Sequence, residues 1–170
     1  SLANILDAMQ AEGYDIGDAP LSTEGVLEAI TTRARNVGGY APGELETLVA
    51  EGDVFRIPVT RYREYLDAHA PTFRDKVLAD CGPPEDGTLM TVPGTNGPDI
   101  IVPAIEYGNV LLMPQPARGW GEDNVQLYHA ADLAPPHQYV ATYAWLRNDY
   151  QVDAVVHLGT HGTLEWLDGK

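Results

Sequence analysis

His157-Leu-Gly-Thr-His-Gly-Thr-Leu-Glu-Trp-Leu-Asp-Gly-Lys170 is the stretch that decides our interpretation of the fold. It follows Val152-Asp-Ala-Val-Val156, a β-branched apolar run that is typical of a buried strand. Imidazoles, a carboxylate and glycines therefore come directly after a predicted strand. In α/β proteins ligands bind at that end of the strands, so we expect a ligand site here.

The polar residues of this stretch are spaced by four. His157, His161 and Glu165 would share one face of a helix, but Gly159 and Gly162 count against helix formation. We expect a loop in which the glycines let the backbone approach a ligand. Imidazole and carboxylate groups suit a divalent metal or a proton transfer, although hydrogen-bonded loop histidines fit the spacing as well.

A phosphate-binding loop does not fit, although the stretch ends in Gly-Lys. That motif needs a glycine five residues before Gly169, and Leu164 occupies the position.

The stretch resembles H-x-G-x-H-G-x-L-E-[WF]-x-P-G-K, the signature of the large subunits of cobaltochelatase and magnesium chelatase. Tryptophan at position 166 resembles the cobaltochelatase branch of the family. Asp168 stands where the family has proline, so the fixed φ that proline would impose on this turn is not expected here. The likeness extends over roughly residues 58–170. Further similar segments are Thr60-Arg-Tyr-Arg-Glu-Tyr65, Gly108-Asn-Val, Gln115-Pro-Ala-Arg-Gly-Trp-Gly-Glu-Asp123, Tyr128-His, Asp132-Leu and Pro135-Pro-His-Gln-Tyr139.

This resemblance implies an ATP-dependent chelatase that inserts Co2+ into hydrogenobyrinic acid a,c-diamide in cobalamin biosynthesis. It also implies partner subunits, an AAA+ ATPase and accessory chelatase subunits, that hydrolyse ATP. We expect a cytoplasmic location, with which the cysteine content agrees. Magnesium chelatase, which inserts Mg2+ into protoporphyrin IX, is the nearest alternative. A non-catalytic tetrapyrrole- or metal-binding module and an α/β domain with structural histidines are the others.

Metal insertion requires that water leaves the cation and that two pyrrole protons are removed. We expect Glu165 and His161 to be catalytic, with Glu165 accepting a proton. Arg118 would hold a substrate carboxylate, and Trp120 would cover the macrocycle, although it could equally anchor its own loop. The expected metal ligands are His157, His161 and His137, and the expected substrate-binding residues are Arg118, Trp120, His129 and Trp166.

Composition limits the class of protein. The 170 residues, 44% of them hydrophobic, suffice for one sizeable core. A net charge of −15 disfavours nucleic acid and anionic membranes as partners, and a solvated acidic surface is its simplest interpretation. Cys81 is the only cysteine, which excludes an internal disulfide and fits a reducing cytoplasm. No apolar run is long enough to predict a membrane span.

We expect a piece of a longer subunit, because the chain starts without methionine and stops inside a motif. Residues 1–56 form a predicted helical segment, with helices from residue 2, after Ser22 and over 44–50. Residues 57–170 form a predicted, incomplete α/β chelatase segment. It has helices from residues 60, 71 and 137, and strands over 89–92, 99–102, 110–113 and 152–156.

The strand over 110–113, the helix over 137–147 and the strand over 152–156 form a predicted βαβ unit. Its strands are parallel, so the fold class is α/β with a mostly parallel sheet and the motif loops at the C-terminal strand ends. Residues 114–136 and 157–170 then lie at the same edge of the sheet, and we expect both to face one cleft. His137, near a helix N-terminus, is expected to be neutral and able to bind a metal.

Two further arginines precede this region. Arg61 and Arg63 are suited to binding substrate carboxylates, but pairing with Glu64 or Asp67 is the interpretation that we favour. We expect His69 to be structural.

Overall fold

The computed structural model describes residues 1–38, 41, 43–117 and 133–159. Its N-terminal part holds three helices, α1 (Leu2–Ala11), α2 (Thr23–Arg33) and α3 (Glu44–Glu51). Serine side chains cap the first two: Ser1 accepts a hydrogen bond from the N–H of Asn4, and Ser22 accepts one from the N–H of Gly25. The three predicted helices are confirmed.

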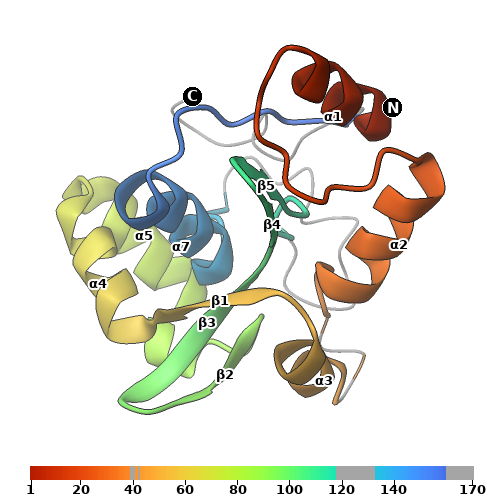
Figure 1. Cartoon of the computed structure of the whole chain (residues 1–170). Coiled ribbons are helices and arrows are strands. Elements are labelled where there is room, and N and C mark those ends of the chain that lie inside the picture. Colours follow the sequence, from red (N-terminus) through yellow and green to blue (C-terminus); the bar gives the residue numbers. More distant parts are fainter. Residues whose placement is uncertain (39–40, 42, 118–132, 160–170) are drawn as a thin grey trace.

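A three-stranded antiparallel sheet crosses the middle of the molecule, made of β1 (Val54–Pro58), β2 (Thr91–Gly94) and β3 (Gly97–Pro103) (Figure 1). β3 is central and is covered on both faces. Ile100 and Val102 belong to the main core, whereas Ile101 packs in a smaller cluster with Leu48 of α3. The strand β1 is absent from the sequence-based prediction, because only Ile57 of its five residues is fully buried.

A second, two-stranded antiparallel sheet joins β4 (Ile105–Tyr107) to β5 (Val110–Leu112). α1 and α2 pack on it in a cluster that includes Leu6, Val26 and Ile105. The turn between the strands contains Gly108 at φ +57°, where a Cβ atom would lie 2.6 Å from Asp15 Oδ1. A side chain at this position would therefore separate the sheet from the segment that follows α1.

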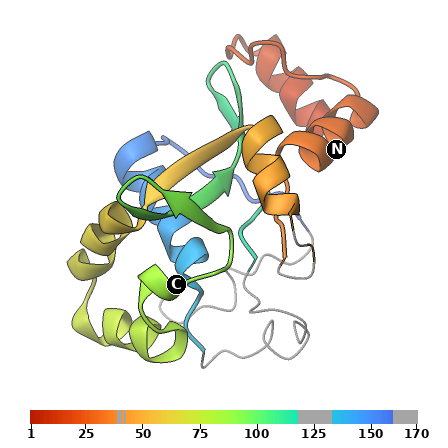
Figure 2. The same cartoon turned by 90° about the horizontal axis from the view of Figure 1, so that it is seen from below.

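The helices α4 (Val59–Ala68), α5 (Pro71–Cys81) and α7 (His137–Trp145) form the other side of the molecule. Figures 1 and 2 place them away from α1 and α2, with the larger sheet between the two groups. The turn η1 (Pro84–Asp86) follows α5, and the π-helical turn η2 (Leu146–Tyr150) extends α7. α7 is buried almost all round and packs on α4 and β3.

The mixture of helices and strands agrees with the predicted α/β class, but the predicted parallel βαβ unit is wrong. β5 pairs antiparallel with β4, and residues 152–156 form no strand. Val155 and Val156 are 51% and 78% exposed. The run pairs with none of the strands in the described part of the chain, and a β-branched sequence without a pairing partner does not form a strand on its own.

The division at residue 56 stays a prediction, and β1 continues across it. None of the helices among the described residues combines the length and the hydropathy needed to cross a membrane.

Candidate functional site

Three side chains connect the two parts of the chain that carry the motif residues. Gln115 Nε2 donates a hydrogen bond to Tyr143 Oη at 3.3 Å and lies 3.5 Å from His157 Nδ1. The rings of Tyr143 and His157 are 6.0 Å apart. We call this contact the Gln115–Tyr143–His157 junction. It brings the residues before Arg118 next to those before His161, which agrees with the expectation of a common cleft.

A residue in the N-terminal half of the chain forms a hydrogen bond with the backbone of Gln115. Asn36 Nδ2 donates a hydrogen bond to the Gln115 carbonyl at 2.7 Å. Asn36 Oδ1 is buried and accepts no hydrogen bond in the described part of the molecule. The segment after α2 therefore helps to position the junction.

Two of the predicted site residues lie within the described residues, and their environments differ. His157 is exposed and contacts the junction from a coil segment. The other predicted site residues lie outside the described residues: Arg118, Trp120, His129, His161, Glu165 and Trp166. Their roles stay predictions.

His137 is held at the start of α7 by both ring nitrogens. Tyr62 Oη lies 2.9 Å from Nδ1, and Nε2 lies 3.0 Å from the Gly82 carbonyl oxygen. The carbonyl can only accept, so Nε2 carries the proton and Nδ1 accepts from the tyrosine. The pKa of His137 is lowered, which favours the neutral form, and the main cause is burial rather than the helix N-terminus on which we based the prediction. With both nitrogens engaged, this arrangement favours a structural role for His137 over metal binding.

No group of three or more His, Cys, Asp or Glu side chains that could hold a metal occurs among residues 1–38, 41, 43–117 and 133–159. Cys81 is half-buried near the Pro135 carbonyl, and burial raises its pKa to about 12, so it is a poor thiolate ligand.

A pocket of about 480 Å³ lies between α4, α5 and α7. Ala68, Phe73 and Val140 contribute apolar surface, and Tyr139 and Tyr143 add ring surface. Leu133, Ala134 and Pro135 also line the pocket, and they directly follow in sequence the stretch that contains Arg118, Trp120 and His129. Tyr143 belongs to both the pocket and the junction, which makes the two adjacent.

The polar lining of this pocket includes two basic side chains, Lys76 and Arg147, together with His69 and Asn148. His69 also packs on Phe73, with ring centroids 5.1 Å apart. The volume falls in the range of small-molecule sites, which are mostly apolar with a few polar groups.

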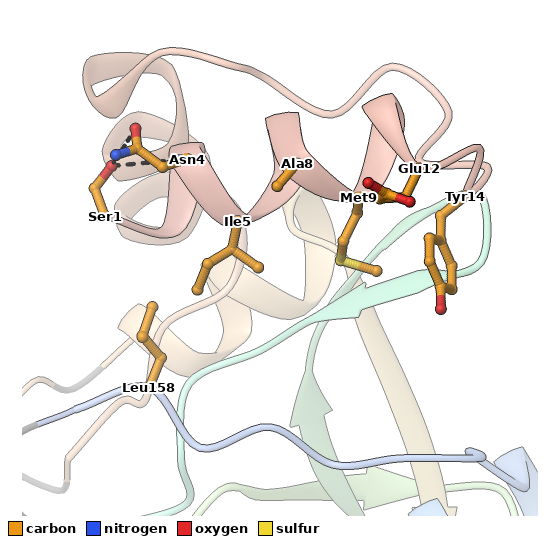
Figure 3. A pocket seen from close by; sticks show the side chains of 8 residues that line it. All are labelled: Ser1, Asn4, Ile5, Ala8, Met9, Glu12, Tyr14 and Leu158. Atoms are coloured by element: carbon orange, nitrogen blue, oxygen red, sulfur yellow. Dashed lines mark hydrogen bonds between the residues drawn. The ribbon is translucent and has the colours of Figure 1, made fainter.

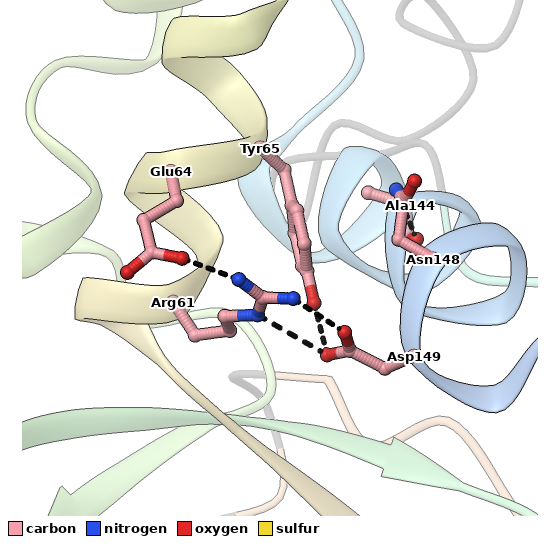
Figure 4. Close-up of polar contacts among 6 residues, drawn as sticks. All are labelled: Arg61, Glu64, Tyr65, Ala144, Asn148 and Asp149. Carbon is pink, nitrogen blue, oxygen red and sulfur yellow. Dashed lines mark hydrogen bonds and ion pairs between the residues drawn. The ribbon is translucent and has the colours of Figure 1, made fainter.

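The wall of the pocket is tied to α4 (Figure 4). Asp149 of η2 binds Arg61 at 2.7 Å and accepts a hydrogen bond from Tyr65 Oη. Arg61 also pairs with Glu64, as we favoured from the sequence, whereas Arg63 pairs with Glu85 rather than Asp67. The contacts with Arg61 and Tyr65 lower the pKa of Asp149. Arg61 and Arg63 both form ion pairs within the fold.

A second pocket, of about 400 Å³, lies where the segment after His157 crosses α1. Leu158 approaches Ile5 there, with Met9 farther along the helix and Tyr14 beyond its C-terminal end (Figure 3). Its described lining has no histidine or arginine side chain. We therefore assign the candidate site to the junction and the first pocket.

The sequence did carry a signal for part of this site. Tyr139, Tyr143 and Arg147 recur every four residues, which places them along one helix face. Lys76 and His69 gave no such signal, because they reach the pocket from other helices.

The CobN/Magnesium Chelatase family matches residues 1–170 of the chain. The aerobic cobaltochelatase subunit CobN of Pseudomonas aeruginosa is 34% identical over 98% of this chain and 12% of its own length. A magnesium-chelatase subunit of Rhodobacter capsulatus is 31% identical over 100% of this chain and 13% of its own length.

Among solved structures, the catalytic subunit of cobaltochelatase from Mycobacterium tuberculosis is similar, with a TM-score of 0.74 and 34% identity. The match covers 98% of this chain and 14% of that one. The chain thus spans about an eighth of the length of its relatives. Because the match extends over every residue, the chain belongs to the CobN/magnesium chelatase family.

Proposed function

We propose that this chain is part of the large, tetrapyrrole-binding subunit of an ATP-dependent cobaltochelatase, which inserts Co2+ into hydrogenobyrinic acid a,c-diamide. The observation that carries the proposal is the Gln115–Tyr143–His157 junction. It joins the two segments whose sequences resemble the family signature. Family membership and the identity to cobaltochelatase subunits support the reaction class.

The residues have separate tasks in this proposal. His157 and His161 offer neutral nitrogens that replace water on the incoming cation. Glu165 accepts a proton from a pyrrole nitrogen as the metal enters. Arg118, Trp120, His129 and Trp166 hold the macrocycle, and AAA+ partner subunits hydrolyse ATP in the cytoplasm.

The test is Glu165→Gln in the full-length subunit, assayed for cobalt insertion with its ATPase partners. Glutamine keeps the shape but cannot accept the proton, so we expect a rate at least about 100-fold lower, with tetrapyrrole affinity unchanged. Glu46→Gln is the matched control, because Glu46 is an exposed acid on α3. An unchanged rate in Glu165→Gln would remove this residue from the mechanism.

Magnesium chelatase is the second candidate, and the 31% identity to a magnesium-chelatase subunit favours its consideration. An absorbance titration of the full-length subunit with hydrogenobyrinic acid diamide and with protoporphyrin separates the two. Binding of the corrinoid precursor alone supports cobalt, and binding of protoporphyrin alone supports magnesium. If the subunit binds a tetrapyrrole but no set of partner subunits supports metal insertion, the chain belongs to a non-catalytic binding module.

A further inference from the structure

One basic side chain stands out in this acidic molecule. The chain has ten Lys and Arg residues, of which Arg118 and Lys170 lie outside the described residues. Arg147 is the member of the remaining set that forms no salt bridge with a described residue. Arg147 is exposed, so its guanidinium is accessible to an anion from outside the chain.

Arg147 lines the pocket between α4, α5 and α7. Lys76 also lines the pocket and binds Asp80 at 3.2 Å. Apart from His69 and Asn148, the remaining lining is mostly aromatic and aliphatic, contributed by Phe73, Tyr139 and Val140 among others. A ligand that matches this lining has a flat or apolar body and at least one carboxylate.

The backbone at Arg147 is unusual. Residues Leu146–Tyr150 form a π-helical turn, and the turn ends at Gln151 with φ +60°. Such turns are rare and frequently occur at functional sites. Here the turn lets Arg147 and Asn148 line the pocket, while Asp149 binds Arg61 on α4. The backbone at Arg147 is therefore positioned by the ion pair of Asp149, two residues later in the same turn.

We propose that this pocket binds the carboxylate-bearing edge of the tetrapyrrole, and that Arg147 binds the carboxylate. This inference rests on the proposed function. Tyr143 lines the pocket and also contacts His157, so a macrocycle held at Arg147 extends over Tyr143 toward the segment that leads to His161 and Glu165. Guanidinium and carboxylate form two parallel hydrogen bonds, which would fix the orientation of the ring.

The experiment compares two forms of one macrocycle on the full-length subunit. Hydrogenobyrinic acid a,c-diamide is titrated beside the same molecule with its free carboxylates converted to methyl esters. We expect Arg147→Gln to weaken binding of the acid about tenfold to 100-fold and to leave binding of the ester unchanged. Arg147→Lys retains the charge without the paired geometry and should lose less.

Arg74→Gln is the matched control, because Arg74 is on the adjacent helix α5, pairs with Asp75 and does not line the pocket. Thermal unfolding of each variant checks that the fold is retained. Equal affinity of wild type and Arg147→Gln for the acid, or an equal loss for acid and ester, would overturn the proposal.

The outcomes separate this inference from the proposed function. If Arg147→Gln binds the acid normally while Glu165→Gln abolishes insertion, the pocket proposal fails and the chelatase proposal stands. If the wild-type subunit binds neither the corrinoid precursor nor protoporphyrin, both fail together.

Discussion

Two histidines with the same predicted metal-binding role, His137 and His157, sit in opposite environments. His137 begins a helix that is buried almost all round, and both of its nitrogens have partners inside the fold. His157 lies on an exposed coil segment, where its ring meets Gln115 and Tyr143. The residue type is the same, and the packing around it decides what its nitrogens are free to bind.

The surrounding segments differ in the same way. α7 and residues 152–156 are both apolar, but α7 meets α4 and β3, whereas Val155 and Val156 face solvent. Apolar sequence therefore indicates burial only where the fold provides a partner surface. The predictions below test this contrast, beginning with the largest effect.

Trp145→Ala should cost about 3–5 kcal/mol of unfolding free energy, because it leaves a cavity in the main core. Trp145 is 7% exposed and packs on Phe55 and Tyr150, with ring centroids 4.7 and 5.0 Å apart. Val156→Ala on the exposed segment should change stability by less than about 0.5 kcal/mol. Urea unfolding measures both, and similar losses in the two variants would contradict the contrast.

Tyr62→Phe should cost about 1–3 kcal/mol, because it leaves the buried Nδ1 of His137 without its donor. The ring is retained, so the loss reports on the hydroxyl alone. Tyr14→Phe is the control, since Tyr14 is 60% exposed. Denaturant midpoints at one pH give the difference, and equal midpoints for both variants would show that the Tyr62 hydroxyl is dispensable.

The smallest effect is a pH dependence at His137. Its pKa in the folded chain is below the ordinary value of 6.5, chiefly because burial disfavours the charged ring. Between the folded pKa and 6.5, the unfolded chain therefore binds more protons at this histidine than the folded chain does. The contribution of neutral His137 to the stability of the fold is present above about pH 6.5 and is lost as the pH falls toward the folded pKa. Melting temperatures measured at decreasing pH should fall more steeply for the wild type than for His137→Gln.

The sequence was informative where local signals decide the structure. Ser22 and the spacing of apolar residues predicted the N-terminal helices. The pairing of strands depends on distant partners, and β4 lies between two predicted strands without a strong pattern of its own. For that reason the antiparallel arrangement was missed.

The site residues named from the sequence stay predictions. The junction of Gln115 and His157 agrees with the expectation that the two motif regions face one cleft, although the reasoning from parallel strands was wrong. His137 has a chemically suitable side chain, but no sequence pattern shows that Tyr62 and Gly82 occupy its nitrogens. Arg147 was overlooked because the lack of an ion pair with the described residues is visible only in three dimensions.

The π-helical turn has a mechanical consequence. Asp149 is clamped to α4 by Arg61 and Tyr65, and Arg147 is only two residues away in the same turn. A displacement of the Arg147 backbone would therefore also displace Asp149 and alter its contacts with Arg61 and Tyr65 on α4.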